Sequence, residues 1–224
     1  MIDEHDVPVI TIDGPSGTGK GTVCHRVAQH LGWHSLDSGS IYRVLALAAQ
    51  REQLTLDNLD LLCELAIHLP LSFDDNDIML NDERVNALIR TEQCGHSASQ
   101  MAAIPEIRHA LLIRQRAFAT VPGLVTDGRD MGTVVFPGAM LKIYLSASAE
   151  IRAERRYLQL KNSGKSDTLA HIAQALAVRD ARDMAREHAP LKPADDAVVI
   201  DTTVLLVQDV VDKVLHEARL RHVW

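Results

Sequence analysis

The sequence predicts an α/β fold in which helices flank a mainly five-stranded parallel β-sheet. Short apolar runs without alternating polar residues are typical of strands that are buried on both faces of a sheet. Stretches with helical spacing of apolar residues separate these runs along the chain. A glycine-rich segment lies directly between the first run and the first helical stretch. The chain has 224 residues, which favours one large domain, or one with an insertion, at roughly 100–200 residues per domain.

The first expected strand covers residues 7–12, and the glycine-rich segment follows it at once. Val23, Val27 and Leu31 then recur at a spacing of four residues, which indicates a helix. The further expected strands are three apolar runs bounded by Asp, Gly or Ser, at 124–126, 141–145 and 197–200, and a shorter run at 33–36. The helical stretches between them cover residues 41–51, 104–119, 150–161 and 170–186.

Residues 69–85 have a different pattern. Apolar runs at 71–73 and 78–80 are separated by an acidic turn, and a second turn precedes residues 84–85. This alternation predicts a small antiparallel meander inserted into the α/β pattern. The acidic turn lacks the glycine and one of the oxygen ligands that a calcium loop requires, so we interpret it as a solvated turn.

The charge distribution favours local anion binding within an acidic protein. The formal net charge is −7, and a general nucleic-acid binder usually needs a basic patch, so no nucleic-acid partner is expected. The chain has 17 Arg but 6 Lys, and ten of the Arg fall within residues 108–186. Arg is suited to bidentate contacts with phosphate and carboxylate groups.

The cysteines and the apolar runs bear on the compartment. Cys24, Cys63 and Cys94 show no paired spacing, which argues against a disulfide framework and a structural zinc site. Residues 1–6 are acidic and lack an apolar signal core, and no apolar run reaches the roughly 20 residues of a membrane helix. We therefore expect a cytoplasmic protein with no membrane partner.

The glycine-rich segment predicts a phosphate-binding loop. Glycines allow successive backbone N–H groups to surround an anion, and the following helix directs its positive end at the same phosphates. Lys20 adds a mobile positive charge, while Gly21 replaces the usual Ser or Thr, so a metal-binding hydroxyl must come from Thr22 or elsewhere. The residues of the loop are Gly14, Pro15, Ser16, Gly17, Thr18, Gly19, Lys20, Gly21 and Thr22. The loop alone does not indicate which reaction follows.

The loop resembles that of nucleoside monophosphate kinases, which typically reads GxxGxGKGT and accounts for the shifted Thr. Four segments together resemble the bacterial cytidylate kinase family. The first, 10–17, runs into the loop, and the later ones are 36–43, 126–137, and 179–183 with Arg186. The resemblance implies a single domain with the P-loop kinase fold, about 1–224. Its core would cover about 1–68, 104–148 and 187–224, with a β-rich monophosphate-binding insert at about 69–103 and a helical lid at about 149–186. It also implies a monomer.

The implied reaction transfers the γ-phosphoryl group of ATP to CMP or dCMP, with Mg²⁺, in pyrimidine nucleotide metabolism. Catalysis of such a transfer is mainly alignment and electrostatic stabilisation, so Arg clusters and a phosphate loop suit it. By resemblance, Lys20 and the loop hold the ATP phosphates, Thr22 binds the metal and Asp127 orients its waters. Arg152, Arg155 and Arg156 begin a lid that closes over ATP. The resemblance leaves open which of them contacts the phosphates, and we assign Arg155 and Arg156 to ATP.

The resemblance also implies the residues that bind the acceptor. Ser38, Arg43, Arg129 and Arg186 contact phosphate, and Arg179 and Asp183 contact the sugar. Asp130 accepts a hydrogen bond from the cytosine amino group, and Ser99 and Arg108 contact the ring; this polarity disfavours uracil. Without the resemblance, Arg179, Asp183 and Arg186 could equally form a solvated ion-pair stripe on a helix, and Ser99 an ordinary small helical residue.

Two alternatives remain open at this point. The chain could be a kinase for another small acceptor, such as UMP or dTMP, or a nucleotide-binding module that transfers no phosphate. A second set of anion-binding Arg argues against the module, because a protein that binds one nucleotide needs one phosphate site.

Overall fold

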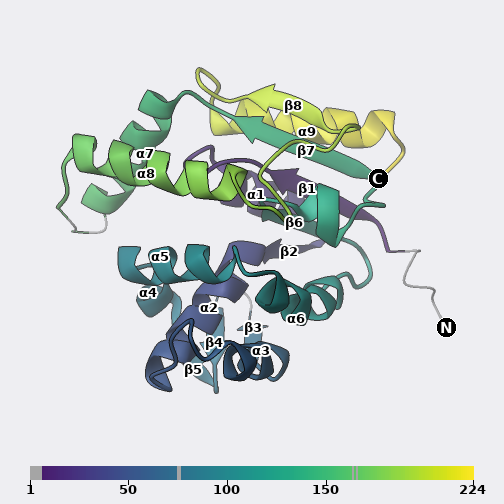
Figure 1. Cartoon of the computed structure of the whole chain (residues 1–224). Coiled ribbons are helices and arrows are strands. Elements are labelled where there is room, and N and C mark those ends of the chain that lie inside the picture. The colour runs from purple at the N-terminus through teal and green to yellow at the C-terminus, as the bar shows by residue number, and fades with distance from the viewer. Residues whose placement is uncertain (1–6, 75–76, 163, 165) are drawn as a thin grey trace. The chain divides into compact units, whose positions relative to one another are not determined.

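A five-stranded sheet forms the centre of the larger of two compact units (Figure 1). The computed structural model describes residues 7–74, 77–162, 164 and 166–224. The strand order is β2-β6-β1-β7-β8, and β1 pairs in parallel with β6 and β7, as β7 does with β8. The five predicted strands are confirmed, as β1 (Val9–Asp13), β2 (His34–Asp37), β6 (Leu124–Gly128), β7 (Leu141–Ser146) and β8 (Val198–Asp201).

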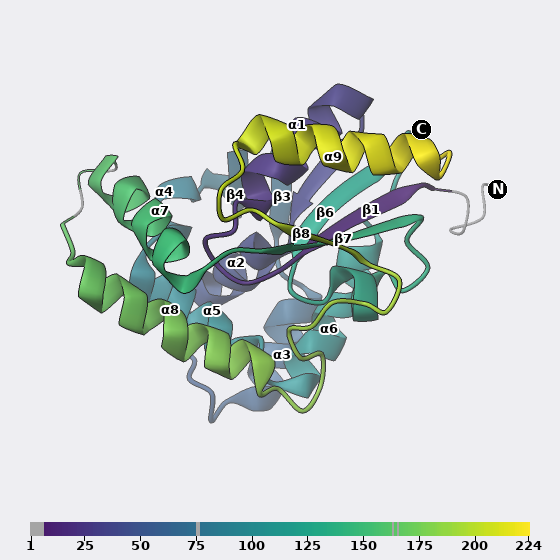
Figure 2. The ribbon, with the colours of Figure 1, turned by 90° about the horizontal axis from the view of Figure 1, so that it is seen from above.

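One face of this sheet is covered by α1 (Lys20–Leu31) and α9 (Val207–Leu220), which lie side by side in Figure 2. The apolar side chains of both helices join those of β1, β6 and β7 in one core: Ile10, Ile12, Val23, Val27, Val125, Ile143, Val210 and Val214 are each 2 % exposed or less. Helix α1 confirms the predicted spacing of Val23, Val27 and Leu31. Helix α9 was not predicted.

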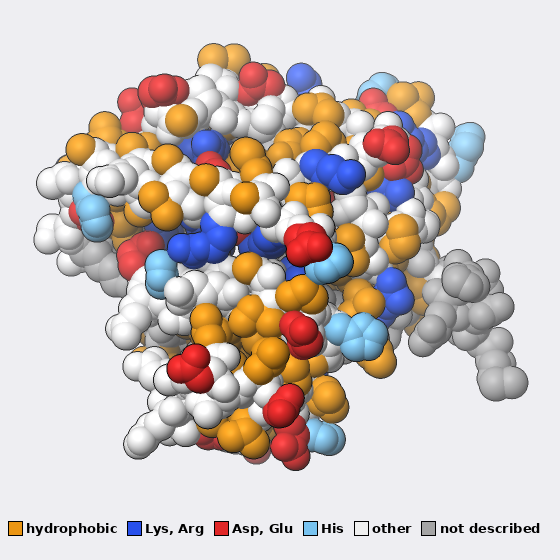
Figure 3. All heavy atoms as spheres, viewed as in Figure 1, with side chains coloured by type: hydrophobic (Ala, Val, Ile, Leu, Met, Phe, Trp, Pro, Cys, Tyr) orange, Lys and Arg blue, Asp and Glu red, His pale blue; other side chains and the backbone are white. Residues whose placement is uncertain are grey.

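Two further helices of this unit, α7 (Ala149–Asn162) and α8 (Leu169–Met184), pack against each other in both views (Figures 1 and 2). Their shared apolar cluster is small and consists of Ala153, Leu160 and Ile172 with Tyr157 and Leu176 at its edge. Both helices were predicted, but residues 163 and 165 of the expected lid tip lie outside the described residues. Helix α8 keeps apolar side chains exposed along its outer side (Figure 3), including Leu169, Val178 and Met184.

The second unit, Asp37–Ala117, contains the predicted meander. Its strands β3 (Leu71–Asp74), β4 (Asp77–Leu80) and β5 (Glu83–Arg84) form an antiparallel sheet; residues 75 and 76 of the acidic turn are outside the described part. The helices are α2 (Ser38–Arg51), α3 (Leu59–Ile67), α4 (Asn86–Ile89), α5 (Glu92–Met101) and α6 (Pro105–Arg116).

The second unit is larger than the insert expected at 69–103. It also contains α2, α3 and α6, which the sequence-based division places in the core. Helix α2 follows β2 without a linker, so the local pattern carries no signal for a boundary at that point. The division of a single kinase domain into core, insert and lid stays a prediction. No helix within the described ranges is long and apolar enough to cross a membrane.

Gly123 shows how closely the backbone packs at the edge of the larger unit. Its carbonyl accepts a hydrogen bond from the His34 backbone at 3.0 Å, which places Gly123 beside the start of β2. A Cβ on Gly123 would lie 2.4 Å from the Trp33 indole, far inside van der Waals contact. A glycine is therefore required here by the ring beside it.

We expect Gly123→Ala to lower the free energy of unfolding by about 1–3 kcal/mol, because the Trp33 indole must move to admit the methyl group. Urea unfolding followed by tryptophan fluorescence measures this loss. Gly138→Ala is the matched control, since a Cβ at Gly138 meets no atom within 4 Å. Equal stability of the two variants would contradict this packing.

Candidate active site

The phosphate loop joins β1 to α1, in the order that the sequence predicts. Gly14 has φ +145°, and a Cβ there would lie 2.1 Å from the Leu145 carbonyl oxygen, so no other residue fits. Gly17 and Gly19 also have positive φ, which turns the chain into the first turn of α1. The N-terminal backbone N–H groups of α1 therefore begin directly at the loop, as anion binding requires.

Lys20 is buried at the start of α1 and folds back over the loop. Its Nζ donates a hydrogen bond to the Pro15 carbonyl at 2.7 Å, and the Thr18 hydroxyl donates to the same oxygen at 3.1 Å. Burial, and then the nearby Arg129 guanidinium, lower the pKa of Lys20 to about 7. An anion bound at the loop would therefore raise the pKa of Lys20 and favour its charged form.

Arg129 connects this loop to α8. It follows β6, and its Nη2 donates to the Ser16 hydroxyl at 2.7 Å, while its Nη1 donates to the Gly128 carbonyl at 3.1 Å. Its Nε donates to Asp183 at 2.9 Å. Arg129, for which the resemblance implies a phosphate contact and a catalytic role, is therefore held in direct contact with the phosphate loop.

The Asp183 carboxylate interacts with three guanidinium groups. It is fully buried on α8; its carboxylate accepts hydrogen bonds from Arg129 and Arg186, and the Arg179 Nε lies 3.9 Å from it. Burial alone would raise the pKa of Asp183, but the three cations outweigh it and the pKa is lowered. Asp183 is thus a common partner of three guanidinium groups and keeps them close together. The reading of these residues as a solvated stripe is wrong, because Asp183 is inaccessible and Arg186 is 9 % exposed.

The side chains predicted for the metal lie at the same loop. Thr22 is exposed on the first turn of α1, and Asp127, near the end of β6, is buried. Asp127 attracts Lys20, and a Cβ on Gly21 would lie 3.9 Å from its Oδ1. Among the residues that the structure describes, no group of three or more His, Cys, Asp or Glu side chains could hold a metal. A hydroxyl and one carboxylate fit Mg²⁺, which is commonly held by one or two carboxylates, waters and substrate phosphates.

Asp13, to which the sequence assigned no role, is a buried carboxylate at the end of β1. It accepts hydrogen bonds from the backbone N–H groups of Met131 at 2.9 Å and Gly132 at 2.8 Å. These bonds fix the start of a π-helical turn, η1 (Met131–Val135), immediately after Arg129 and the buried Asp130. Burial raises the pKa of Asp13 to about 6.

The three Arg of the predicted lid have different partners. Arg155 donates to the Thr202 hydroxyl at 3.0 Å and to the Thr202 carbonyl at 2.6 Å; that hydroxyl lies 3.2 Å from the Thr18 carbonyl. Arg156 donates to Gln159 on its own helix at 2.7 Å. Arg152, which we did not assign to ATP, donates to the Ser16 carbonyl of the phosphate loop at 3.1 Å.

The other predicted residues belong to the second unit. Ser38 is buried at the start of α2, and Ser99 is buried on α5. Arg43 of α2 donates to the Ile89 carbonyl at 2.7 Å and to the Thr91 carbonyl at 3.3 Å, which ties it to the start of α5. Arg108 of α6 donates to the Ala102 carbonyl at 3.1 Å, with its Cζ 5.9 Å from the centre of the Tyr42 ring.

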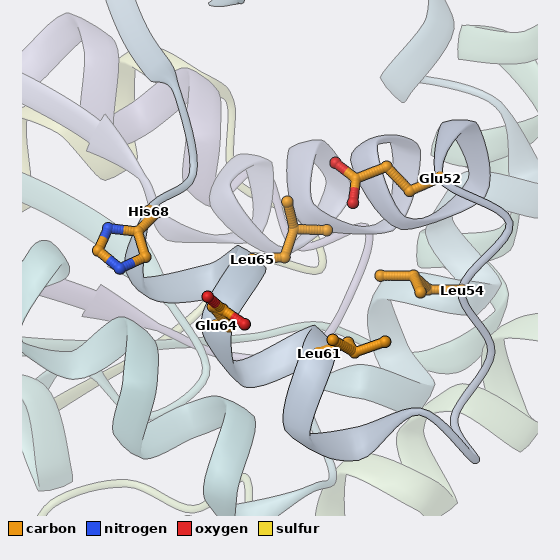
Figure 4. A pocket seen from close by; sticks show the side chains of 6 residues that line it. All are labelled: Glu52, Leu54, Leu61, Glu64, Leu65 and His68. Atoms are coloured by element: carbon orange, nitrogen blue, oxygen red, sulfur yellow. The ribbon is translucent and has the colours of Figure 1, made fainter.

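A separate cavity of about 250 Å³ in the second unit holds none of the predicted residues. Figure 4 shows three Leu side chains beside two carboxylates; the lining residues are Glu52, Leu54, Leu61, Glu64, Leu65 and His68. The two carboxylates make it unsuitable for a phosphate group.

The family model for cytidylate kinase matches residues 10–220. The chain belongs to the cytidylate kinase family. Two cytidylate kinases illustrate the similarity: that of Shewanella frigidimarina is 53% identical over 214 residues, with 93% of each chain covered, and that of Pseudomonas savastanoi pv. phaseolicola is 53% identical over 220 residues, with 96% covered. A gluconokinase structure from Sinorhizobium meliloti aligns at 15% identity and a TM-score of 0.50, covering 96% of this chain and 94% of that one. This supports the P-loop kinase fold.

The site of this cytidylate kinase family member contains two residues that sequence reasoning missed, Asp13 and Asp180, and Arg152, which was predicted in the lid without an assigned contact. All three have buried side chains in direct contact with other residues of the site. Asp13 precedes Gly14 at the end of a strand, a position that could have marked it. Asp180 lies three residues before Asp183, and no sequence pattern indicates which Arg it meets.

We expect Asp13→Asn to change the pH dependence of stability. The pKa of Asp13 is about 6 in the folded chain, above the ordinary 3.8, so its favourable contribution is present below pH 4 and lost as the pH rises toward 6. Asn does not titrate. Relative to the wild type, the variant should therefore gain about 2 kcal/mol of unfolding free energy between pH 4 and pH 7.

Urea unfolding at both pH values measures this gain, whatever constant loss the removed carboxylate causes. Asp195→Asn, at an exposed position, is the control and should follow the wild-type pH dependence. A constant difference between Asp13→Asn and the wild type would contradict the raised pKa of Asp13.

Proposed function

We propose that this protein transfers the γ-phosphoryl group of ATP to CMP or dCMP, giving ADP and CDP or dCDP. Membership of the cytidylate kinase family supports the substrate pair. The observation that carries the proposal is the hydrogen bond between Arg129 and Ser16, which joins two anion-binding groups. One is the phosphate loop with Lys20, and the other is the Arg cluster around Asp183. A kinase that acts on a nucleoside monophosphate must hold two phosphorylated substrates together, whereas a nucleotide-binding module needs one phosphate site.

On this proposal, the chain acts by alignment and charge. The backbone N–H groups of the loop and Lys20 hold the ATP phosphates, and Arg129 and Arg186 offset the repulsion between the two substrates. Arg155 and Arg156 serve ATP from the lid, whose closure excludes water. When bound with ATP, Mg²⁺ supplies further neutralisation of phosphate charge, and Thr22 and Asp127 are the residues that would hold it.

The acceptor is assigned to a second group of residues. Ser38 and Arg43 bind its phosphate, and Arg179 and Asp183 its sugar. Because the Asp183 carboxylate already accepts from Arg129 and Arg186, a sugar hydroxyl would have to share it. The residues proposed for the base are Ser99, Arg108 and Asp130. Of these, Asp130 is the acceptor that matches the cytosine amino group. The monomeric state, the cytoplasmic location and the lack of a nucleic-acid partner stay predictions.

A coupled ADP-release assay with ATP, Mg²⁺ and a panel of CMP, dCMP, UMP, AMP, GMP and dTMP tests the function. We expect turnover mainly with CMP and dCMP. Asp130→Ala should lower the preference for CMP over UMP by about tenfold or more, since it removes the acceptor that a cytosine amino group needs. The KM for ATP is the internal control and should stay within about twofold of the wild type.

Turnover with another acceptor would keep the phosphate sites and overturn the assignment of the base. Folded protein that binds ATP without acceptor-dependent turnover would favour the binding module. An unchanged CMP preference in Asp130→Ala would leave the reaction intact and remove Asp130 from base recognition.

Lys20 should take up a proton when ATP binds. Its pKa is about 7 without ligand, so at pH 8 it is mostly neutral, and a bound polyanion raises that pKa. Titration calorimetry at pH 8 in two buffers of different ionisation enthalpy, without acceptor, measures the uptake. Lys20→Arg is the control, because a guanidinium stays protonated and adds no uptake. Equal proton uptake by the variant and the wild type would contradict the low pKa.

A further inference from the structure

A buried ion pair joins α7 to α8, which lie side by side in Figures 1 and 2. The Arg152 Nη1 donates to the Asp180 Oδ2 at 2.5 Å, and both side chains are about nine-tenths buried. The sequence places Arg152 in the predicted lid without assigning its contact, and it gives Asp180 no role. Because burying two charges is costly unless each is well paired, the position of this pair calls for a reason beyond helix packing.

The other contacts of Arg152 lie at the phosphate loop. Its Nη1 also donates to the Ser16 carbonyl at 3.1 Å, and its Nε donates to the Ala147 carbonyl at 3.2 Å. A Cβ on Gly17 would lie 2.9 Å from the Arg152 Cβ, so the loop and the first turn of α7 touch without space for a side chain. The guanidinium is thus held against the same loop that holds Lys20.

Each group of this pair has one polar atom that its hydrogen bonds within the described residues leave unused. Asp180 accepts at one oxygen; its Oδ1 is buried and has no hydrogen-bond partner among the described residues. Arg152 uses Nη1 and Nε, and its Nη2 makes no hydrogen bond within the described chain. A bidentate pair would have engaged Nη2 as well. The single-point contact holds the guanidinium in place and leaves Nη2 for an anion at the loop.

We propose that Asp180 is a positioning residue, which holds the Arg152 guanidinium where its Nη2 meets the phosphates of ATP. This inference rests on the proposed function. Asp180 itself touches no substrate in this arrangement. It offsets the burial cost of the arginine charge and restricts the rotation of a long side chain, so that less order has to be imposed when ATP binds.

A role confined to joining α7 and α8 predicts a different result. Loss of Asp180 would then lower the free energy of unfolding and leave the affinity for ATP unchanged in the folded fraction. A positioning role predicts a selective loss of ATP affinity. The two are separated by measuring binding and stability on the same variants.

The test measures equilibrium binding of a non-hydrolysable ATP analogue and of CMP by titration calorimetry. Asp180→Asn should weaken analogue binding about tenfold and change CMP binding less than about twofold, because a misplaced guanidinium affects one substrate. Asp180→Glu, which keeps the charge, should recover part of the loss. The control is Asp196→Asn, whose carboxylate pairs with Lys142 at an exposed position; it should bind both ligands as the wild type does.

A second pair of variants tests whether Asp180 acts through Arg152. Arg152→Ala should weaken analogue binding, and Arg152→Ala/Asp180→Ala should bind no more weakly, since no guanidinium is left to position. This double variant buries no unpaired charge, so it decides the question even where Asp180→Asn does not fold.

Wild-type affinity for the analogue in Asp180→Asn or in Arg152→Ala would overturn the proposal. So would a further loss of threefold or more in the double variant. A wild-type enzyme that binds the analogue but phosphorylates no acceptor would refute the proposed function and leave this binding test unaffected.

Discussion

The carboxylate of Asp183 is the contact on which the arrangement of the larger unit's site depends. Arg129, Arg179 and Arg186 would repel one another if they were brought together without it. Their shared partner is fully buried, so the attraction is weakly screened and the guanidinium groups are held in fixed directions. Since Arg129 also donates to Ser16, the carboxylate on α8 helps to determine the position of a cation at the phosphate loop.

The parallel sheet explains why these groups meet. The carboxyl ends of β1, β6, β7 and β8 lie at one edge, where ligands bind in open α/β sheets. Asp13 ends β1, Arg129 follows β6, Ala147 follows β7, and Thr202 follows β8. Backbone groups at this edge serve as partners for charged side chains: Arg152 meets the Ala147 carbonyl and Arg155 the Thr202 carbonyl.

Burial shifts the two titratable groups beside the loop in opposite directions. The pKa of Lys20 falls to about 7 and that of Asp13 rises to about 6, in each case first because the charged form is desolvated. Burial therefore disfavours the charged form of each group. The charged form of Asp13 is stabilised by hydrogen bonds from two backbone N–H groups, and that of Lys20 by its hydrogen bond to the Pro15 carbonyl. A site arranged for a polyanion before the anion arrives has this electrostatic character.

The sequence by itself determined the features that local patterns encode. Uninterrupted apolar runs predicted the five strands, four-residue spacing predicted α1, and alternating turns predicted the meander, since each pattern reflects the period of its own element. The glycines and Lys20 could be placed between the first strand and the first helix because strand ends and loops are local features. The family resemblance added the substrate pair, which spacing does not reveal.

The tertiary structure alone decided which side chains meet. Arg152, Arg155 and Arg156 lie within five residues of one helix, yet they contact Ser16, Thr202 and Gln159 respectively. Asp180 and Asp183 are equally close in sequence and pair with different arginines. The turn η1 depends on Asp13, 118 residues before Met131. Partners so far apart in the chain are chosen by how strands and helices pack, and no local period of apolar residues records that choice.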